Sequence, residues 1–175
     1  MTPFEAGLWT LPSALMTMLV SPISGRLIGT VGTRVPLVLA GIGIAGAGAV
    51  LTTVQASTPM WVLVAAFVLF GFGFGMVNAP ITNTAVSGMP RAQSGSAAAV
   101  ASTSRQTGVS LGVALAGTVT GASAVATVGS GFAVATHPMW WIVVGIGTAI
   151  VLVGFLSTTT AARRSVESIA PLLRG

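Results

Sequence analysis

Long apolar stretches separated by short polar breaks dominate the hydrophobic pattern of this sequence. A helix needs about 20 apolar residues to cross the hydrocarbon of a bilayer. Five stretches meet or approach this length, and they run over residues 6–28, 35–54, 60–86, 94–127 and 139–157. The first is the least regular, because it contains Pro12 and Pro22 and ends near Arg26. The pattern predicts an all-α integral membrane protein of about five transmembrane helices, with four as the alternative count.

The composition supports a membrane protein and argues against a soluble one. Of the 175 residues, 53% are apolar and only 5% are charged. Ordinary soluble domains carry about 25% charged residues, so this chain cannot cover a surface that faces water. No polar linker or fixed-period repeat divides the apolar stretches. We therefore expect a single membrane domain over residues 1–175, which ends in a cytoplasmic tail at 158–175.

The inventory of reactive side chains argues against catalysis. The chain contains one histidine, no cysteine and two acidic residues, Glu5 and Glu167, which are far apart in the sequence. Acid–base or nucleophilic chemistry needs a base placed beside the reacting group. We expect no enzyme, no metal site and no cofactor. The net charge of +5 comes from arginines that stand singly or in pairs, which indicates lipid headgroups rather than nucleic acid as the partner.

The arginines also predict how the chain is oriented. Positive residues favour the cytoplasmic side of a membrane. The first and third connections and the tail contain Arg26, Arg34, Arg91, Arg163, Arg164 and Arg174, whereas the second and fourth connections have no positive residue. The tryptophans stand at the start of the first, third and fifth stretches, where indole rings would anchor at one interface. We expect a multi-pass plasma-membrane protein with an outside amino terminus and a cytoplasmic carboxy terminus.

A glycine-rich segment with the sequence GRLIGTVGTR joins the first two stretches. Glycines permit a tight return of the chain between two helices. The segment contains Gly25, Gly29 and Gly32, together with Arg26 and Arg34, which would hold it at the cytoplasmic face. These five residues are candidates for a cytoplasmic gating loop. A simple glycine-rich turn explains them equally well.

The third stretch combines small residues with polar ones. Gly71 and Gly75 are four positions apart, a spacing that places small residues on one helix face for close packing. Pro80 has no backbone N–H and predicts a kink. The side chains of Asn78, Thr82 and Asn83 need a polar partner or a wet cavity within the hydrocarbon. These three are substrate-pathway candidates, and hydrogen bonding between helices is the equal alternative.

The fourth stretch begins its apolar part at Arg105 and Gln106. The long arginine side chain can extend to the membrane surface, which is the simpler interpretation. Alternatively, Arg105 and Gln106 project into the cytoplasmic end of a substrate pathway. Gly108 and Gly112 continue another face of small residues that predicts tight helix packing.

The order and spacing of these motifs resemble the drug:proton antiporters of the major facilitator superfamily, in particular the fourteen-helix branch. The resembling segments are Thr2–Leu8 with Leu11 and Pro12, the loop at residues 25–34, residues 71–80 and residues 105–117. The loop departs from the family pattern, because Gly29 and Thr30 stand where that pattern has Asp and Arg. A charged latch based on that acid is therefore absent.

The resemblance implies that this chain is the last five helices of a multidrug or small-molecule efflux transporter, within the carboxy-terminal half of the fold. Such transporters alternate access by rocking two halves about a central site. We expect a carboxy-terminal fragment that is incomplete and inactive alone, with a small-molecule substrate if amino-terminal helices complete it. No apolar stretch contains a carboxylate, so protons would be handled by the missing segment. The alternative is a small helical membrane subunit or pore without its own transport cycle.

Overall fold

The computed structural model describes residues 3–55, 57–86, 94–125 and 135–156 as an all-helical chain. A helix lies in each of the five predicted stretches. The helices are α1 (Pro3–Val31), α2 (Arg34–Leu51), α3 (Met60–Val86), α4 (Ser94–Val125) and α6 (His137–Leu156). The all-α prediction is therefore confirmed. Arg91 and the predicted tail at 158–175 lie outside the described residues.

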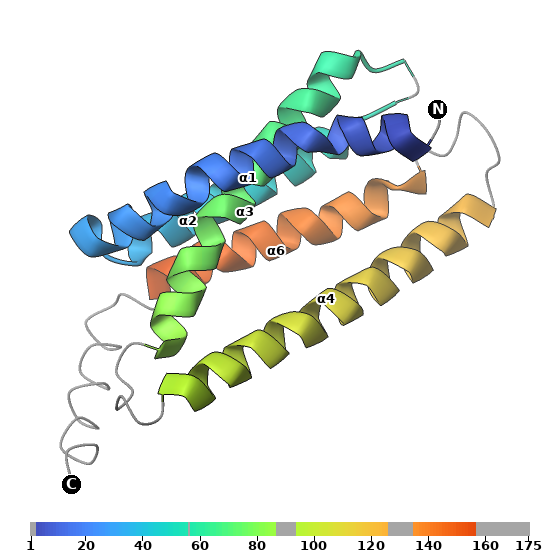
Figure 1. Cartoon of the computed structure of the whole chain (residues 1–175). Coiled ribbons are helices and arrows are strands. Elements are labelled where there is room, and N and C mark those ends of the chain that lie inside the picture. Colours follow the sequence, from blue (N-terminus) through green and yellow to red (C-terminus); the bar gives the residue numbers. More distant parts are fainter. Residues whose placement is uncertain (1–2, 56, 87–93, 126–134, 157–175) are drawn as a thin grey trace, which may run out of the picture.

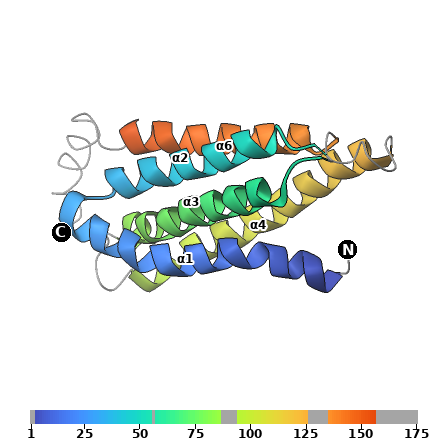
Figure 2. The same cartoon turned by 90° about the horizontal axis from the view of Figure 1, so that it is seen from above.

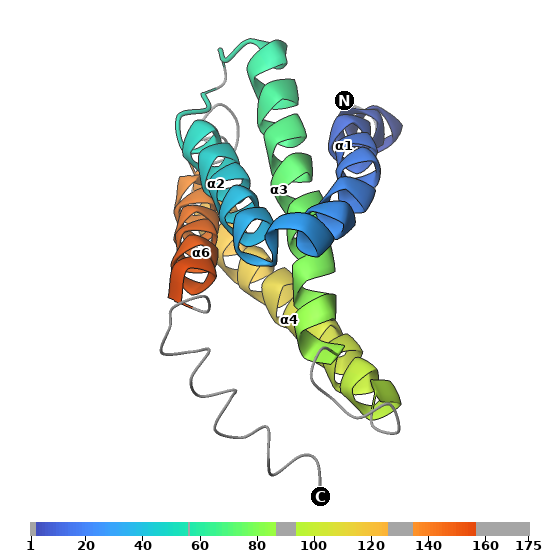
Figure 3. The ribbon, with the colours of Figure 1, turned by 90° about the vertical axis from the view of Figure 1, so that its left-hand side faces the viewer.

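The helices run back and forth along one common direction (Figures 1 and 2). The helices α1, α3 and α6 begin toward the right-hand end of Figure 1, whereas α2 and α4 begin toward the left-hand end. Three close pairings order the bundle, because α3 packs against both α1 and α2, and α2 also packs against α6. Figure 3 shows α3 between α1 and α2, with α4 crossing beneath the lower half of α3. The α1–α2 connection, the end of α3 and the start of α4 thus lie at the end of the bundle opposite to the α2–α3 connection.

The helix α4 differs from the other four. Among the described residues, four helical segments are long and apolar enough to cross a membrane: Gly7–Val31, Arg34–Leu51, Met60–Asn83 and His137–Leu156. The sequence of α4 is rich in serine, threonine and glycine and includes Arg105, which lowers its apolar character. Most described side chains of α4 are exposed, and its contacts with α3 and α6 are sparse. Packing within this chain buries little of α4.

Close contact between glycines and neighbouring backbones forms the centre of the bundle. A methyl group on Gly73 of α3 would lie 2.7 Å from the carbonyl oxygen of Ala40 on α2. One on Gly41 of α2 would lie 2.6 Å from the carbonyl oxygen of Gly147 on α6. Heavier side chains at these positions would force the helices apart, so the glycines set the spacing between α2, α3 and α6.

The packing predicted for Gly71 and Gly75 is present at the α1–α3 contact. A methyl group on Gly71 would overlap the backbone of Ser13, and one on Gly75 would lie 3.0 Å from the carbonyl oxygen of Thr17. The Thr17 hydroxyl also donates a hydrogen bond of 3.1 Å to the carbonyl oxygen of Gly71. The two helices therefore approach backbone to backbone.

The turn between α1 and α2 is shorter than the sequence pattern predicted. Helix α1 continues to Val31, so Gly25 and Gly29 are helical residues and do not form the return of the chain. Gly32 makes the turn, because it adopts a φ of +80° that side chains with a Cβ rarely tolerate. Apolar residues between the glycines support helix formation up to this point, so α1 ends three residues beyond the predicted boundary at residue 28.

Two side-chain contacts join the ends of the α2–α6 pair. The guanidinium of Arg34, at the start of α2, lies 4.8 Å from the ring centre of Phe155, near the end of α6. A cation over an aromatic face is attracted by the ring's negative π-face. At the other end, His137 Nε2 lies 2.9 Å from the carbonyl oxygen of Val54. Arg34 thus contacts a neighbouring helix from its place beside the turn.

Candidate functional site

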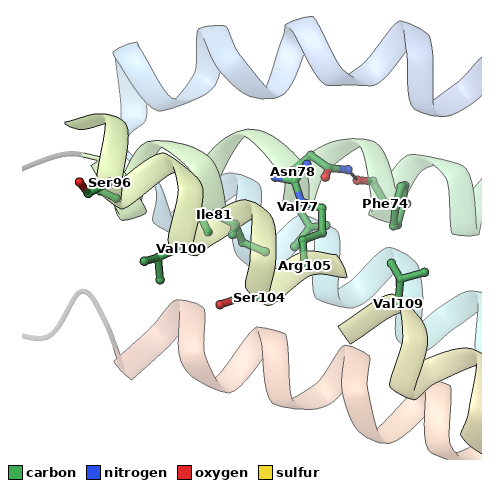
Figure 4. Close-up of a pocket in the computed structure, with 11 residues that line it drawn as sticks. Phe74, Val77, Asn78, Ile81, Ser96, Val100, Ser104, Arg105 and Val109 are labelled. Atoms are coloured by element: carbon green, nitrogen blue, oxygen red, sulfur yellow. Dashed lines mark hydrogen bonds between the residues drawn. The ribbon is translucent and has the colours of Figure 1, made fainter. Parts of the chain in front are cut away.

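A cavity of about 1070 Å³ lies between α3 and α4 (Figure 4). Pockets for drug-sized ligands commonly enclose roughly 300–1,000 Å³, so the space is large enough for such a molecule. Its wall is mainly apolar. The polar side chains on the wall are Asn78 from α3 and Ser96, Ser104 and Arg105 from α4.

Helical periodicity explains how each wall is built. On α3, the lining residues Phe74, Val77, Asn78 and Ile81 follow the i, i+3, i+4, i+7 spacing that places side chains on one helix face. The lining residues of α4 recur in the same way, from Ala97 through Ala101 to Arg105. The site is therefore formed by two facing helical stripes rather than by loops.

Asn78 lies on the cavity wall, half-buried, and its amide is paired within its own helix. The Nδ2 group donates a hydrogen bond of 2.8 Å to the carbonyl oxygen of Phe74, one turn earlier. This bond lies within α3 and is not the bond to a neighbouring helix that the sequence offered as one interpretation. Its position on the wall matches the cavity interpretation (Figure 4).

Arg105 reaches from α4 toward α3, where its side chain lies beside Val77 and Asn78 (Figure 4). Its Nη2 donates a hydrogen bond of 3.2 Å to the hydroxyl of Thr82. That hydroxyl in turn donates a hydrogen bond of 3.0 Å to the carbonyl oxygen of Asn78. Three of the five predicted pathway residues thus form one connected group at the α3–α4 contact.

The other two predicted pathway residues are placed differently. Asn83 and Gln106 are exposed and do not belong to the cavity wall. A helix turns about 100° per residue, so each points away from the face that its neighbour Thr82 or Arg105 uses. Among the described residues, no three histidine or acidic side chains gather into a set that could hold a metal ion.

The packing predicted for Gly108 and Gly112 does not form among the described residues. A methyl group on either glycine would meet no described atom of another helix within 4 Å. These glycines share their spacing with Gly71 and Gly75, but α4 diverges from its neighbours, so no backbone approaches them. The spacing of small residues predicted a helix face that could pack closely, but it did not predict whether another helix would lie against that face.

Sequence reasoning missed Ser24, whose buried hydroxyl bonds the carbonyl oxygen that Pro80 leaves without a helical donor in α3. Pro80 lacks the N–H that would bond the carbonyl oxygen of Met76 in a regular helix. The Ser24 hydroxyl, from α1, donates a 2.8 Å hydrogen bond to that carbonyl oxygen. Both Ser24 and Pro80 are almost fully buried. The sequence does contain a pattern that could have indicated this contact, because small and hydroxyl residues recur along α1 from Ser13 to Ser24.

Comparison with known proteins gives the family of this chain. The family model described as Major Facilitator Superfamily matches residues 1–113. This match spans α1, α2, α3 and the part of α4 that contains Arg105, and it is almost two thirds of the chain. The chain belongs to the major facilitator superfamily of membrane transporters.

Similar proteins of known name are resistance and export proteins of bacteria. The chain is 35% identical over 115 residues to a tetracycline resistance determinant of Streptomyces rimosus, an alignment that covers 65% of this chain and 33% of that protein. It is 32% identical over 118 residues to the multidrug resistance protein Stp of Mycobacterium tuberculosis, which covers 67% of this chain and 22% of Stp. It is 33% identical over 117 residues to the tetracenomycin C resistance and export protein of Streptomyces glaucescens. That alignment covers 67% of this chain and 22% of that protein.

The matched segment is a small part of each relative. The alignments span between 22% and 33% of the length of these three proteins. No solved structure matches the chain. The relatives support a transporter of the drug-resistance type, and the recognition from sequence motifs is confirmed at that level.

Proposed function

We propose that this chain is the carboxy-terminal part of an efflux transporter of the fourteen-helix drug:proton branch, and that the α3–α4 cavity is part of its substrate pathway. The observation that carries this proposal is the position of Asn78 and Arg105. Both line one drug-sized cavity, and both lie in the segment that matches the superfamily. The names of three similar proteins, each a resistance or export protein, support small-molecule efflux.

The proposal includes an orientation in the plasma membrane. The end of the bundle where α1 and α3 end is cytoplasmic, and the end where α1, α3 and α6 begin is outside. The positions of Arg26 and Arg34 near the first of these ends support this orientation. In this arrangement α4 crosses the membrane with the help of further helices, which cover the face that is exposed in this chain.

Transport by this chain alone is not expected. No aspartate or glutamate occurs between residues 6 and 166, so the apolar stretches supply no carboxylate for proton coupling. In liposomes with an imposed pH gradient, the purified chain should show no saturable, gradient-dependent dye movement. Robust assembly into a conducting oligomer would instead favour a pore.

A graft tests the pathway directly. Residues 1–113 replace the matching segment of the tetracycline resistance determinant, and the chimaera is expressed in drug-sensitive bacteria. The chimaera should confer resistance, and Asn78→Leu should reduce it at equal expression because the cavity wall changes. The matched control is Asn83→Leu, the same change at an exposed position away from the wall, which should retain resistance. Equal resistance in both variants would refute the assignment of the cavity.

A further inference from the structure

Arg105 places a positive charge on a cavity wall that has no acidic side chain among its lining residues. The sequence contains two acidic residues, Glu5 and Glu167, and none between them. None of the lining residues is acidic. A cation held within the depth of a bilayer is costly unless an opposite charge or water compensates it. The compensating group must therefore come from outside the cavity wall.

The contacts of Arg105 orient its guanidinium without neutralising it. Thr82 is a neutral acceptor, and its hydroxyl proton is already directed to the carbonyl oxygen of Asn78. A guanidinium carries five N–H donors in a planar fork that matches the paired oxygens of carboxylate, sulfonate or phosphate. Among the described residues, Thr82 is the hydrogen-bond partner that the side chain meets. Further donors remain for a ligand.

The rest of the wall is suited to an apolar body. Phe74, Val77 and Ile81 of α3 face Val100 and Val109 of α4 across the cavity. The charged group and the apolar surface therefore adjoin one another within one space. A ligand that fits both must be amphipathic, with its polar group at the Arg105 end.

We propose that the cavity binds amphipathic small molecules that carry an anionic group, and that Arg105 is the residue that selects for this charge. This inference rests on the proposed function, because it names the substrate class of the same cavity. The apolar body of the ligand occupies the space between α3 and α4. The anionic oxygens accept hydrogen bonds from the guanidinium, which Thr82 holds toward α3.

Two fluorescent probes that share one skeleton test this proposal. Anilinonaphthalene sulfonate carries a negative sulfonate, and phenylnaphthylamine has the same rings without it. Binding of each is measured on the full chain in nanodiscs of zwitterionic lipid, after subtraction of empty nanodiscs. Wild type should bind the sulfonate about tenfold more tightly than the neutral probe, which corresponds to about 1.4 kcal/mol.

Variants assign the preference to Arg105. Arg105→Gln should lower sulfonate affinity to that of the neutral probe, while neutral binding stays unchanged and shows that the cavity is intact. The matched control is Arg26→Gln, which removes an exposed arginine of α1 that is not on the cavity wall, and it should keep the preference. Equal affinity of wild type for both probes, or a preference that survives Arg105→Gln, would overturn the inference.

Two further arms separate this inference from its alternatives. Ala101→Trp fills the cavity wall and should abolish binding of both probes, whereas Ala114→Trp, on α4 away from the wall, should not. If Ala101→Trp abolishes neutral binding and no sulfonate preference exists, the pathway proposal stands and the charge selection fails. If neither probe binds saturably, the pathway proposal and the charge selection both fail.

A lipid headgroup is the alternative source of the anionic group. Anionic phospholipid that copurifies with wild type but not with Arg105→Gln, detected by native mass spectrometry, would assign the site to a lipid headgroup and overturn the inference.

Discussion

The hydrogen bond between Ser24 and the segment of α3 that precedes Pro80 should be the polar contact on which this bundle depends most. Its acceptor, the carbonyl oxygen of Met76, has lost its helical donor because residue 80 is proline. The Ser24 hydroxyl is fully buried and lies 2.8 Å from that oxygen. Ser24→Ala removes the donor with almost no change in volume, so the effect on stability isolates the hydrogen bond.

The expected magnitude follows from the environment of the carbonyl. Leaving a buried acceptor unpaired costs about 1–3 kcal/mol in general. Hydrogen bonds between membrane helices average only about 0.6 kcal/mol, with a maximum of about 1.7, because neighbouring groups usually compensate. Pro80 prevents compensation by the backbone here, so we expect a loss of about 1–2 kcal/mol in the free energy of unfolding.

A control on the same helix separates this bond from a general loss of hydroxyl groups. The Ser21 hydroxyl donates to the carbonyl oxygen of Thr17, one turn earlier in α1. That carbonyl keeps its helical N–H partner in the variant, so Ser21→Ala should cost less than about 0.5 kcal/mol. Both variants are compared with the parent by titration with sodium dodecyl sulfate in mixed micelles, with helical circular dichroism as the signal.

A double-mutant cycle with Pro80→Ala provides the decisive comparison. Alanine at position 80 restores a backbone N–H that can donate to Met76, so the carbonyl no longer depends on Ser24. The cost of Ser24→Ala should then fall by about 1 kcal/mol relative to its cost in the parent. A cost equal to that of Ser21→Ala in the parent, or the same cost in both backgrounds, would refute the reasoning.

Two further predictions concern packing and topology. Gly73→Ala should destabilise the chain by about 1–3 kcal/mol, because its methyl group would overlap the α2 backbone. Gly112→Ala is the control and should be neutral or stabilise the chain by about 0.5–1 kcal/mol. Equal effects of the two variants in the same unfolding titration would contradict the packing. A cysteine at Ser57 should react with a membrane-impermeant thiol reagent on intact cells, and one at Thr30, at the opposite end of the bundle, should not. The reverse labelling pattern would invert the proposed orientation.

The sequence alone predicted where the helices of the described residues lie. Each needs about 20 apolar residues to cross a bilayer, and this length requirement leaves a pattern that can be read without a partner. The predicted ranges 35–54 and 60–86 accordingly correspond to α2 and α3 with small shifts at the ends. The boundary of α1 was less predictable, because Gly25 and Gly29 favour a turn locally while the apolar residues around them continue the helix to Val31.

The candidate site was predictable only in part. The polar residues Asn78, Thr82 and Arg105 were found because polar groups in an apolar stretch are costly and need an explanation. Nothing in the local pattern separated Asn78 from Asn83, since both interrupt the same helix. Asn78 lines the cavity and Asn83 does not, because only one face of α3 meets α4. The crossing of the two helices decides which face that is.

Whether a small residue packs against another helix was decided by the tertiary structure and not by the sequence pattern. Gly71 and Gly75 share a four-residue spacing with Gly108 and Gly112, yet the first pair contacts the α1 backbone and the second pair contacts no neighbour within 4 Å. Periodicity describes one helix surface, whereas packing depends on the shape and position of a second surface. The carbonyl of Met76 likewise has its donor more than fifty residues away in the sequence, at Ser24, because α1 packs against α3.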